Sequence, residues 1–385
     1  MEFSLHNYLR QLSTDGATFD YIEAIKRNAQ PLVERGLPVI LSLGHLAHAT
    51  GTSHHILMSI AKRQVDPYRV FAISKRSGGK RFICAPEPQL LKVQRWIHDH
   101  VLCSSHVLKN LSSAGTAYMP GGGHIKNAKR HLGAEWLVKL DITRFFESVS
   151  ERQVYHVFRG LGYRALVAFF FARLCTRVLP ANVDKRGWKK SDRWATEKYW
   201  KFLSTDVLGH LPQGAPTSPM LANLVCAGLD KELQKLAQAK ELIYSRYADD
   251  MTFSGQMSSR LDAALVIKKM SREISNHGFS INHQKTSISK NGGRKIVTGL
   301  SVADDVVRLP RIFKNNLKKD VYYLCTYGVE EHCARIGQKN RFSYLMHVAG
   351  RIQYAKIIEP KLAARLDAQF KNKFPDFENL VAQVG

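Results

Sequence analysis

The sequence has few cysteines and none of the pairs that indicate a metal site or a disulfide framework. The six cysteines are isolated, and the two nearest each other, Cys325 and Cys333, are eight positions apart. Because no C-x-x-C pair occurs, the sequence indicates neither a zinc site nor a disulfide scaffold. Isolated cysteines are typical of a reducing compartment, which predicts a cytoplasmic protein.

A long hydrophobic run is also missing. The most apolar stretch, Ala165 to Cys175, contains Arg173 and is too short to cross a bilayer, so we expect a buried helix there. The first residues, MEFSLHNYLRQL, show no basic segment followed by an apolar core. We therefore expect no signal peptide and no membrane partner.

Acidic residues are scarce relative to basic ones. The 385 residues include 57 Lys and Arg against 32 Asp and Glu, which gives a formal net charge of +25 and a pI near 9.9. Such an excess favours a polyanionic partner, because binding to phosphates releases counterions. The alternative is a soluble protein that is merely basic. Membrane-surface binding fits less well, because the basic residues are spread along the whole chain.

Apolar sequence is sufficient for a buried core, since 44% of the residues are hydrophobic. The length suggests two or three packed subdomains. The patterns predict helices at 1–64, 88–103, 151–178, 218–240, 257–276 and from 311 onward, hairpins at 68–86 and 243–254, a strand at 135–141 and short strands within 281–302. This order predicts a mixed α+β fold and not a doubly wound sheet. The basic, tryptophan-containing stretch at about 180–210 reads as a surface insertion.

Two adjacent carboxylates stand at the tip of the second predicted hairpin, in Tyr247-Ala248-Asp249-Asp250. Apolar residues flank them on both sides. Neighbouring carboxylates repel each other, so a purely structural role is costly, and a bound divalent cation removes the cost. An Asp-Asp turn by itself is commonplace.

A third acid, Asp141, ends the apolar strand Trp136-Leu137-Val138-Lys139-Leu140. If that strand lies beside the hairpin, Asp141 meets Asp249 at one edge of the sheet. Three carboxylates could then hold two Mg²⁺ ions, one activating an attacking hydroxyl and one supporting a leaving pyrophosphate. In-line phosphoryl transfer needs this positioning and charge neutralisation more than covalent chemistry.

The segment Leu211 to Pro219, with sequence LPQGAPTSP, predicts a tight loop that opens a helix. Gly214 would allow the backbone to approach a bound group closely, and Ser218-Pro219 suits a helix start. Alone, the segment could be an ordinary helix cap.

Asp141, the Gln213 loop and Tyr247–Asp250, in this order and at this spacing, resemble the reverse transcriptases. The resemblance implies a right-hand polymerase fold: fingers at 65–134, a palm at 135–305 carrying the insertion, and a helical thumb at 306–385, after an N-terminal helical segment at 1–64. It implies RNA-directed DNA polymerase activity with Asp141, Asp249 and Asp250 as catalytic residues. Ile142 joins these three in the implied metal site for two Mg²⁺ ions, for which Mn²⁺ could substitute.

The resemblance also implies a site for the incoming deoxynucleoside triphosphate. Phe146 matches the steric gate that excludes a ribose 2′-hydroxyl, with Phe145 beside it as a core aromatic. Gln213 matches a residue near the nucleotide and template, and Lys285 matches the lysine that protonates pyrophosphate. Lys80 and Arg81 match the fingers residues that clamp the triphosphate; without the family they would read equally well as a solvated strand end.

Two further motifs resemble bacterial retron reverse transcriptases: Asn127-Ala128-Lys129-Arg130-His131 and Val297-Thr298-Gly299. The resemblance implies binding of a structured noncoding RNA, msr–msd, and priming from the 2′-hydroxyl of an internal guanosine. The product would be branched msDNA, and an effector protein would act with the enzyme in antiphage defence. Asn127, His131, Val297, Thr298 and Gly299 are the implied RNA-binding positions, and the oligomeric state stays open.

The C-terminal segment interleaves basic and aromatic residues, which favours contact with RNA. Lys314, Lys318 and Arg335 are the predicted RNA-binding residues there, although a helix pair with core aromatics would show the same pattern. Three alternatives remain: a group II intron-like enzyme, an abortive-infection reverse transcriptase, and an RNA-binding module with an inert polymerase site. The first should carry a maturase or endonuclease extension, and about 80 residues follow the last palm motif.

Overall fold

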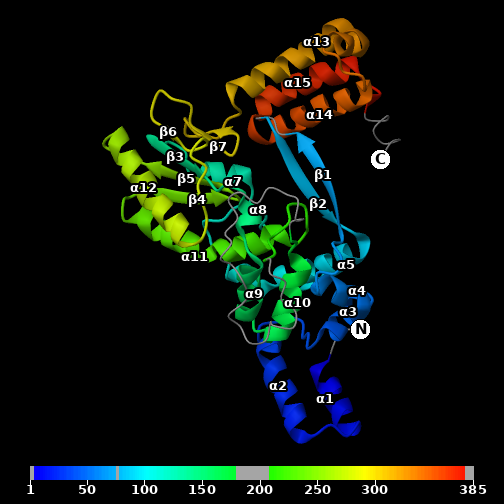
Figure 1. The fold of residues 1–385 in the computed structure, drawn as a ribbon. Helices are drawn as coiled ribbons and strands as arrows, with labels where there is room; N and C mark the ends of the chain where they lie inside the picture. The colour runs from blue at the N-terminus through cyan, green and yellow to red at the C-terminus, as the bar shows by residue number, and fades with distance from the viewer. Residues whose placement is uncertain (1–3, 75–77, 179–207, 378–385) are drawn as a thin grey trace.

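A computed structural model of the protein describes residues 4–74, 78–178 and 208–377 (Figure 1). Helices and strands follow one another in the mixed order that the sequence predicts, so the α+β expectation is confirmed. The predicted insertion at about 180–210, with Trp188, Trp194 and Trp200, lies outside the described residues except for its last three positions.

The N-terminal segment consists of helices, as predicted. They are α1 (Leu5–Thr14), α2 (Phe19–Glu34), α3 (Leu43–Thr50) and α4 (His54–Ala61). The turn after α2 contains Gly36, whose φ of +63° is readily adopted only without a Cβ. Figure 1 shows α1 and α2 at one end of the molecule, away from the sheets.

The hairpin predicted at 68–86 consists of β1 (Tyr68–Ser74) and β2 (Lys80–Pro86), paired antiparallel. It extends from the body of the molecule toward the C-terminal helices (Figure 1). The helix predicted at 88–103 is α5 (Pro88–Trp96), continued by a π-helical turn, η1 (Ile97–Leu102). Two short helices follow, α6 (Ser105–Lys109) and α7 (His124–Lys129).

A four-stranded antiparallel sheet has the strand order β4-β5-β3-β6. The strands are β3 (Trp136–Asp141), β4 (Ile243–Tyr247), β5 (Asp250–Gly255) and β6 (Ser287–Ser289). Side chains alternate between its faces. One face is apolar, because the paired residues Val138 and Phe253, and Leu140 and Met251, share it. It packs on α11 (Ser218–Gln238) and α12 (Arg260–Asn276), as Figure 1 shows.

The opposite face of this sheet carries polar side chains beside the buried Leu137. Lys139 pairs with Thr252 and Asp141 with Asp250, so these four side chains share it. Asp141 and Asp250 therefore lie on the face that α11 and α12 leave uncovered, at the end of the strands. The apolar core on the other face stabilises the strands, and the acids are not part of that core.

The region predicted as helical at 151–178 forms two helices, α9 (Glu151–Gly160) and α10 (Ala165–Cys175), after the short α8 (Phe145–Ser148). The break contains Gly162, with φ of +104°. Residues 167–175 of α10 are all buried, which confirms the expected buried helix. Among the described residues, no helix is long and apolar enough to cross a membrane.

The C-terminal part has its own apolar cluster, which also includes Leu137 of the sheet. It contains the small hairpin of β7 (Ile296–Val297) and β8 (Leu300–Ser301) and the helices α13 (Arg311–Arg335), α14 (Arg341–Ile358) and α15 (Pro360–Lys373). Helices from Arg311 onward were predicted and are confirmed.

Candidate active site

Three carboxylates lie at one edge of the four-stranded sheet. Asp141 ends β3 and is the register partner of Asp250, which begins β5. Asp249 lies in the turn between β4 and β5, and its carbonyl accepts a hydrogen bond from the Ile142 amide at 3.0 Å. The tertiary pairing thus brings Asp141 to two adjacent acids that lie about a hundred residues further along the sequence.

Two lysines offset the charge of these acids. The Lys285 Nζ lies 2.8 Å from Asp141 Oδ2, and the Lys139 Nζ lies 3.0 Å from Asp250 Oδ2. Burial, and then the charge of Asp141, raises the pKa of Asp249; burial also raises the pKa of Asp250 despite Lys139. The hydrogen bond to Asp141 raises the pKa of Lys285. Carboxylates with raised pKa values at one edge would gain from a nearby cation.

The acids share an edge but do not yet point at one centre. In the described part of the chain, no three metal-binding side chains converge closely enough to hold an ion as they stand. Asp141 and Asp250 are directed to their lysines instead. The strand register fixes the shared edge, whereas the carboxylates can rotate about their side-chain bonds. Ile142 is buried and aliphatic, so only its carbonyl oxygen could join a metal site.

A buried arginine supports the turn that carries Asp249. The Arg246 Nη1 donates to the Ala248 carbonyl at 3.2 Å, and Ala248 has a φ of +56°, which a non-glycine residue adopts at some cost. Both Asp230 oxygens accept from Arg246 at 2.8 Å, and Asn223 accepts at 3.1 Å. Sequence reasoning missed this support, although a basic residue inside a strand of mostly buried residues was a signal for it.

The two phenylalanines differ in exposure, as predicted. Phe145 is buried, whereas Phe146 is half-buried. The ring of Phe146 lies 6.3 Å from that of Tyr118. Burial, followed by the charge of Asp249, raises the pKa of Tyr118, which places this tyrosine near the acids. Tyr118 was not among the predicted residues, since no motif marks its loop.

The Gln213 loop lies against β2. The Gln213 carbonyl accepts from the Cys84 amide at 2.7 Å. At Gly214, where φ is +117°, a Cβ would lie 2.8 Å from Ile83 Cγ2 and 3.0 Å from the Cys84 carbonyl oxygen. The glycine thus permits close approach of the loop to the hairpin. The expectation that it also serves approach to a bound group stays a prediction. The helix start at Ser218-Pro219 is confirmed.

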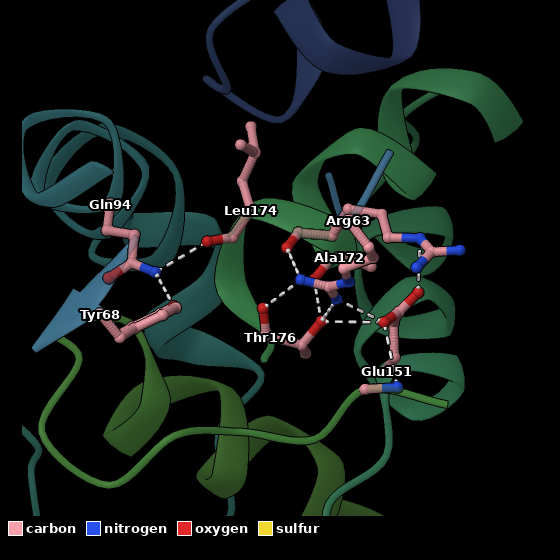
Figure 2. A network of polar contacts seen from close by, with 9 residues as sticks. Arg63, Tyr68, Gln94, Glu151, Ala172, Leu174 and Thr176 are labelled. Atoms are coloured by element: carbon pink, nitrogen blue, oxygen red, sulfur yellow. Dashed lines mark hydrogen bonds and ion pairs between the residues drawn. The ribbon is translucent and has the colours of Figure 1, made fainter. Parts of the chain in front are cut away.

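A buried ionic network holds the beginning of the same loop (Figure 2). Glu151 lies between Arg63, at 2.6 Å, and Arg173, at 2.9 Å. Burial opposes the charge on Glu151, but the two guanidinium groups hold its pKa below the ordinary value. The Gly209 amide donates to Glu151 at 3.2 Å, and a Cβ at Gly209 would lie 2.2 Å from that oxygen. The loop is therefore fixed at both of its sides.

The hairpin β1–β2 brings Arg81 within electrostatic range of Lys285 and Tyr118. Arg81 is exposed on β2, and its charge acts on both Lys285 and Tyr118. Lys80 precedes it and is also exposed, with its side chain on the other face of the strand.

Asn127 and His131 are fully buried, so neither offers a surface to RNA in this structure. The His131 Nδ1 lies 2.6 Å from Ser254 Oγ, and its Nε2 lies 2.6 Å from Ser245 Oγ. Asn127 Oδ1 accepts from Thr116 at 2.8 Å. Direct RNA contact is therefore corrected to a packing role that holds α7 on β4 and β5.

Burial lowers the pKa of His131 to about 3, against an ordinary value of 6.5. Between these values the unfolded chain binds a proton that the folded chain does not, so acidification destabilises the fold by about 1.4 kcal/mol per pH unit. From pH 7 to pH 5 the free energy of unfolding should fall by about 2 kcal/mol through this residue. Urea unfolding of the wild type and of His131→Gln, whose amide can still bridge the serines, should show a smaller loss in the variant. Equal losses would contradict the assignment.

The second predicted motif packs against the first. Thr298 and Gly299, with φ of +46° and +84°, form the turn between β7 and β8, and Thr298 Oγ1 donates to the His124 carbonyl of α7 at 2.8 Å. Val297 is buried in the same cluster as Ala128. RNA contact by the Val297 side chain is therefore also corrected, whereas Thr298 and Gly299 reach the surface.

The predicted basic residues of the C-terminal helices have different partners. Lys314 forms an ion pair with Glu359 at 3.2 Å, and Arg335 forms one with Glu331 at 2.6 Å. Lys318 is exposed on the same helix as both. Two of the three charges are thus partly offset within this region.

Comparison with known proteins identifies reverse transcriptases as relatives of this chain. A family model described as "Reverse transcriptase (RNA-dependent DNA polymerase)" matches residues 73–345. The Retron Mx65 reverse transcriptase of Myxococcus xanthus is 30% identical over 347 residues, covering 87% of this chain and 72% of that protein. The Retron Mx162 reverse transcriptase of the same organism is 33% identical over 311 residues, covering 74% and 60%. The Retron Ec86 reverse transcriptase of Escherichia coli is 28% identical over 335 residues, covering 86% and 89%.

Proposed function

The chain belongs to the reverse transcriptase family, and we propose that it makes branched msDNA. It is an RNA-directed DNA polymerase with the right-hand polymerase fold, and retron reverse transcriptases are its relatives. On this proposal it binds a structured noncoding RNA, msr–msd, primes from the 2′-hydroxyl of an internal guanosine and copies part of that RNA. The observation that carries polymerisation is the meeting of Asp141, Asp249 and Asp250 at one sheet edge.

The domain assignment follows from the same premise. Residues 65–134 correspond to fingers, 135–305 to the palm and 306–385 to the thumb, after the helical segment at 1–64. On this assignment the sheet with the acids would belong to the palm. The hairpin β1–β2, assigned to the fingers, extends toward the C-terminal helices that would form the thumb (Figure 1).

The three carboxylates and the Ile142 carbonyl would hold two Mg²⁺ ions, with Mn²⁺ as a substitute. Their fit to oxygen-preferring cations rests on the donor set and on the raised pKa values of Asp249 and Asp250. The ions would supply charge neutralisation to the attacking hydroxyl and the leaving pyrophosphate. Lys285, which is protonated at neutral pH and pairs with Asp141, would leave Asp141 and donate a proton to pyrophosphate.

The surrounding residues would bind and select the nucleotide. The charge of Arg81 acts on Lys285, so Arg81 lies where it would clamp the triphosphate, with Lys80 beside it. Gln213, held in place by β2, would position the base. The half-buried Phe146 would face the sugar and exclude a 2′-hydroxyl, supported by the buried Phe145 at a ring distance of 5.4 Å.

Replacing Phe146 with alanine should raise ribonucleotide incorporation relative to deoxyribonucleotide incorporation. We expect the kcat/KM ratio to change roughly 10- to 100-fold, the scale of steric discrimination in a closed pocket. Single-nucleotide extension with dGTP and GTP measures it. Phe146→Tyr keeps the ring and should keep the preference; an unchanged ratio in Phe146→Ala would remove the gate role.

The remaining surface would hold the RNA. Lys318, Arg335, Lys314, Thr298 and Gly299 are the candidates for contact, whereas the buried Asn127, His131 and Val297 would position α7 and the β7–β8 turn beneath it. The net charge of +25 supports a polyanionic partner. By resemblance to the retron enzymes, an effector protein would act with the RNA–DNA complex in antiphage defence.

The product itself tests the proposal. Nucleic acid is extracted from the protein purified with its native upstream locus and is run on a denaturing gel with and without RNase. A discrete DNA band that shifts on RNase treatment, and is missing in Asp249→Ala, is the expected result. RNA alone would indicate an inert RNA-binding module. Heterogeneous DNA that is indifferent to RNase would indicate an abortive-infection or group II intron-like enzyme and overturn the retron assignment.

A further inference from the structure

A hollow of about 790 Å³ lies on the C-terminal helices, within the size range of about 300–1,000 Å³ typical of ligand sites. Most of its lining comes from α13, and His347 and Arg351 come from α14. Gly328, with φ of 82° and ψ of 171°, interrupts α13 and turns its last residues. Tyr327 and His332, on opposite sides of this kink, both line the hollow.

The lining of the hollow carries more positive than negative charge. Lys319, Arg335 and Arg351 are its permanent cations, and Asp320 is its carboxylate. Asp320 forms an ion pair with Arg351, and Arg335 pairs with Glu331. Lys319 has no ion-pair partner among the residues that the structure describes. The hollow therefore favours an anionic ligand.

Aromatic rings give the hollow flat surfaces beside these charges. The rings of Tyr323 and Tyr327, one helical turn apart, lie 5.9 Å from each other. The Lys319 Nζ lies 5.6 Å from the centre of the Tyr323 ring, and the Arg335 guanidinium carbon lies 4.5 Å from that of Tyr327. Tyr327 keeps 39% of its surface exposed. Rings and a guanidinium plane of this kind stack on unpaired bases, while the cations hold the phosphates.

We propose that this hollow binds one or two unpaired nucleotides of single-stranded RNA. The inference rests on the proposed function, which supplies an RNA partner, and adds where and in what form the RNA is bound. An RNA duplex fits less well, because its bases are stacked on each other and cannot reach Tyr323 or Tyr327. An acidic protein segment could form ion pairs with Lys319 and Arg335, but it has no bases to stack on the tyrosine rings.

Fluorescence anisotropy with a labelled single-stranded RNA octamer, and with an RNA duplex of equal length, tests the proposal on the full chain. Tyr327→Ala should weaken binding of the single strand roughly 5- to 100-fold, the effect of losing one stacked base, and should change duplex binding by less than twofold. Tyr322→Ala is the matched control, because Tyr322 is a neighbouring tyrosine of the same helix, is 60% exposed and does not line the hollow. Its affinity should stay within twofold of the wild type.

A second variant keeps the test decisive if Tyr327→Ala misfolds. Lys319→Ala should reduce the slope of log affinity against log salt by about 0.7, the value for one phosphate contact on a single strand. Equal losses in Tyr327→Ala and Tyr322→Ala, equal losses for single strand and duplex, or an unchanged salt slope would overturn the proposal. Displacement of the RNA from the wild type by poly-glutamate at matched ionic strength, with no effect of Tyr327→Ala, would point to an acidic partner instead. DNA synthesis by the wild type on an added RNA template and DNA primer is scored separately, so failure of this site is distinguishable from failure of the polymerase.

Discussion

Replacing Asp249 with asparagine is expected to lower the rate of DNA synthesis by roughly three orders of magnitude, since several kcal/mol of charge stabilisation depend on its carboxylate. The change keeps the size of the side chain and leaves the main-chain bond between the Asp249 carbonyl and Ile142 in place. RNA affinity should therefore stay within about twofold of the wild type, because the C-terminal surface is untouched.

Fold stability should not fall together with activity. Burial and the charge of Asp141 both raise the pKa of Asp249, which means that its negative charge is unfavourable in the folded protein. Removing that charge should leave the free energy of unfolding equal to or above that of the wild type. A loss of activity with no loss of stability separates a catalytic role from a structural one.

Primer extension at saturating Mg²⁺ and urea unfolding measure the two effects. Asp304→Asn is the control, because Asp304 is an exposed acid whose partner is Arg308, four residues away. It should leave both quantities unchanged. Synthesis by Asp249→Asn at more than a tenth of the wild-type rate would sink the assignment of this carboxylate.

Local sequence was enough to place the catalytic candidates on their elements. The strand ending at Asp141 and the hairpin around Asp249 are short, apolar and bounded by polar residues, so periodicity predicts them. The strand register could not be predicted from the sequence, because Asp141 faces Asp250 only when β3 lies between β5 and β6. The family motifs predicted the positions of the acids in the sequence. The pairing of β3 with β5 brings these acids together in the structure.

The burial of residues within motifs could not be predicted in the same way. His131 belongs to a motif whose resemblance to the retron enzymes implied contact with RNA. Both its ring nitrogens, however, lie against serines of two strands more than a hundred residues away. The same holds for Gly214, whose close contact is with β2. In both cases the deciding neighbour is distant in sequence, and no local pattern names it.

Arg246 and Asp230 form a second kind of support that no motif reveals. Arg246 is 1% exposed and Asp230 is 0% exposed, and two hydrogen bonds of 2.8 Å join them. Burial opposes the charge on Arg246, but Asp230 more than compensates and raises its pKa above the ordinary value. The Tyr244 hydroxyl also donates to Asp230 at 2.8 Å. This group links α11 to the turn that carries Asp249.

Removing one member of the buried Arg246–Asp230 pair should strongly destabilise the fold. Asp230→Ala leaves a buried guanidinium without its carboxylate, so we expect the free energy of unfolding to fall by about 3–5 kcal/mol. The triple change Asp230→Leu, Arg246→Met and Tyr244→Phe replaces the whole group with apolar side chains of similar size. Such replacements are often neutral, so most of the stability should return. Urea unfolding of both variants measures this part.

Activity should not return with stability. In the triple variant the Ala248 carbonyl has lost its donor, and with it a hydrogen bond to a charged group, of the kind that contributes about 1.5–3 kcal/mol. If that bond holds Asp249 in position for catalysis, kcat should stay roughly 10- to 100-fold below the wild type while KM for the nucleotide changes little. Recovery of kcat together with stability would show that Arg246 supports the fold alone. Recovery of stability without kcat would establish Arg246 as the residue that positions the turn carrying Asp249.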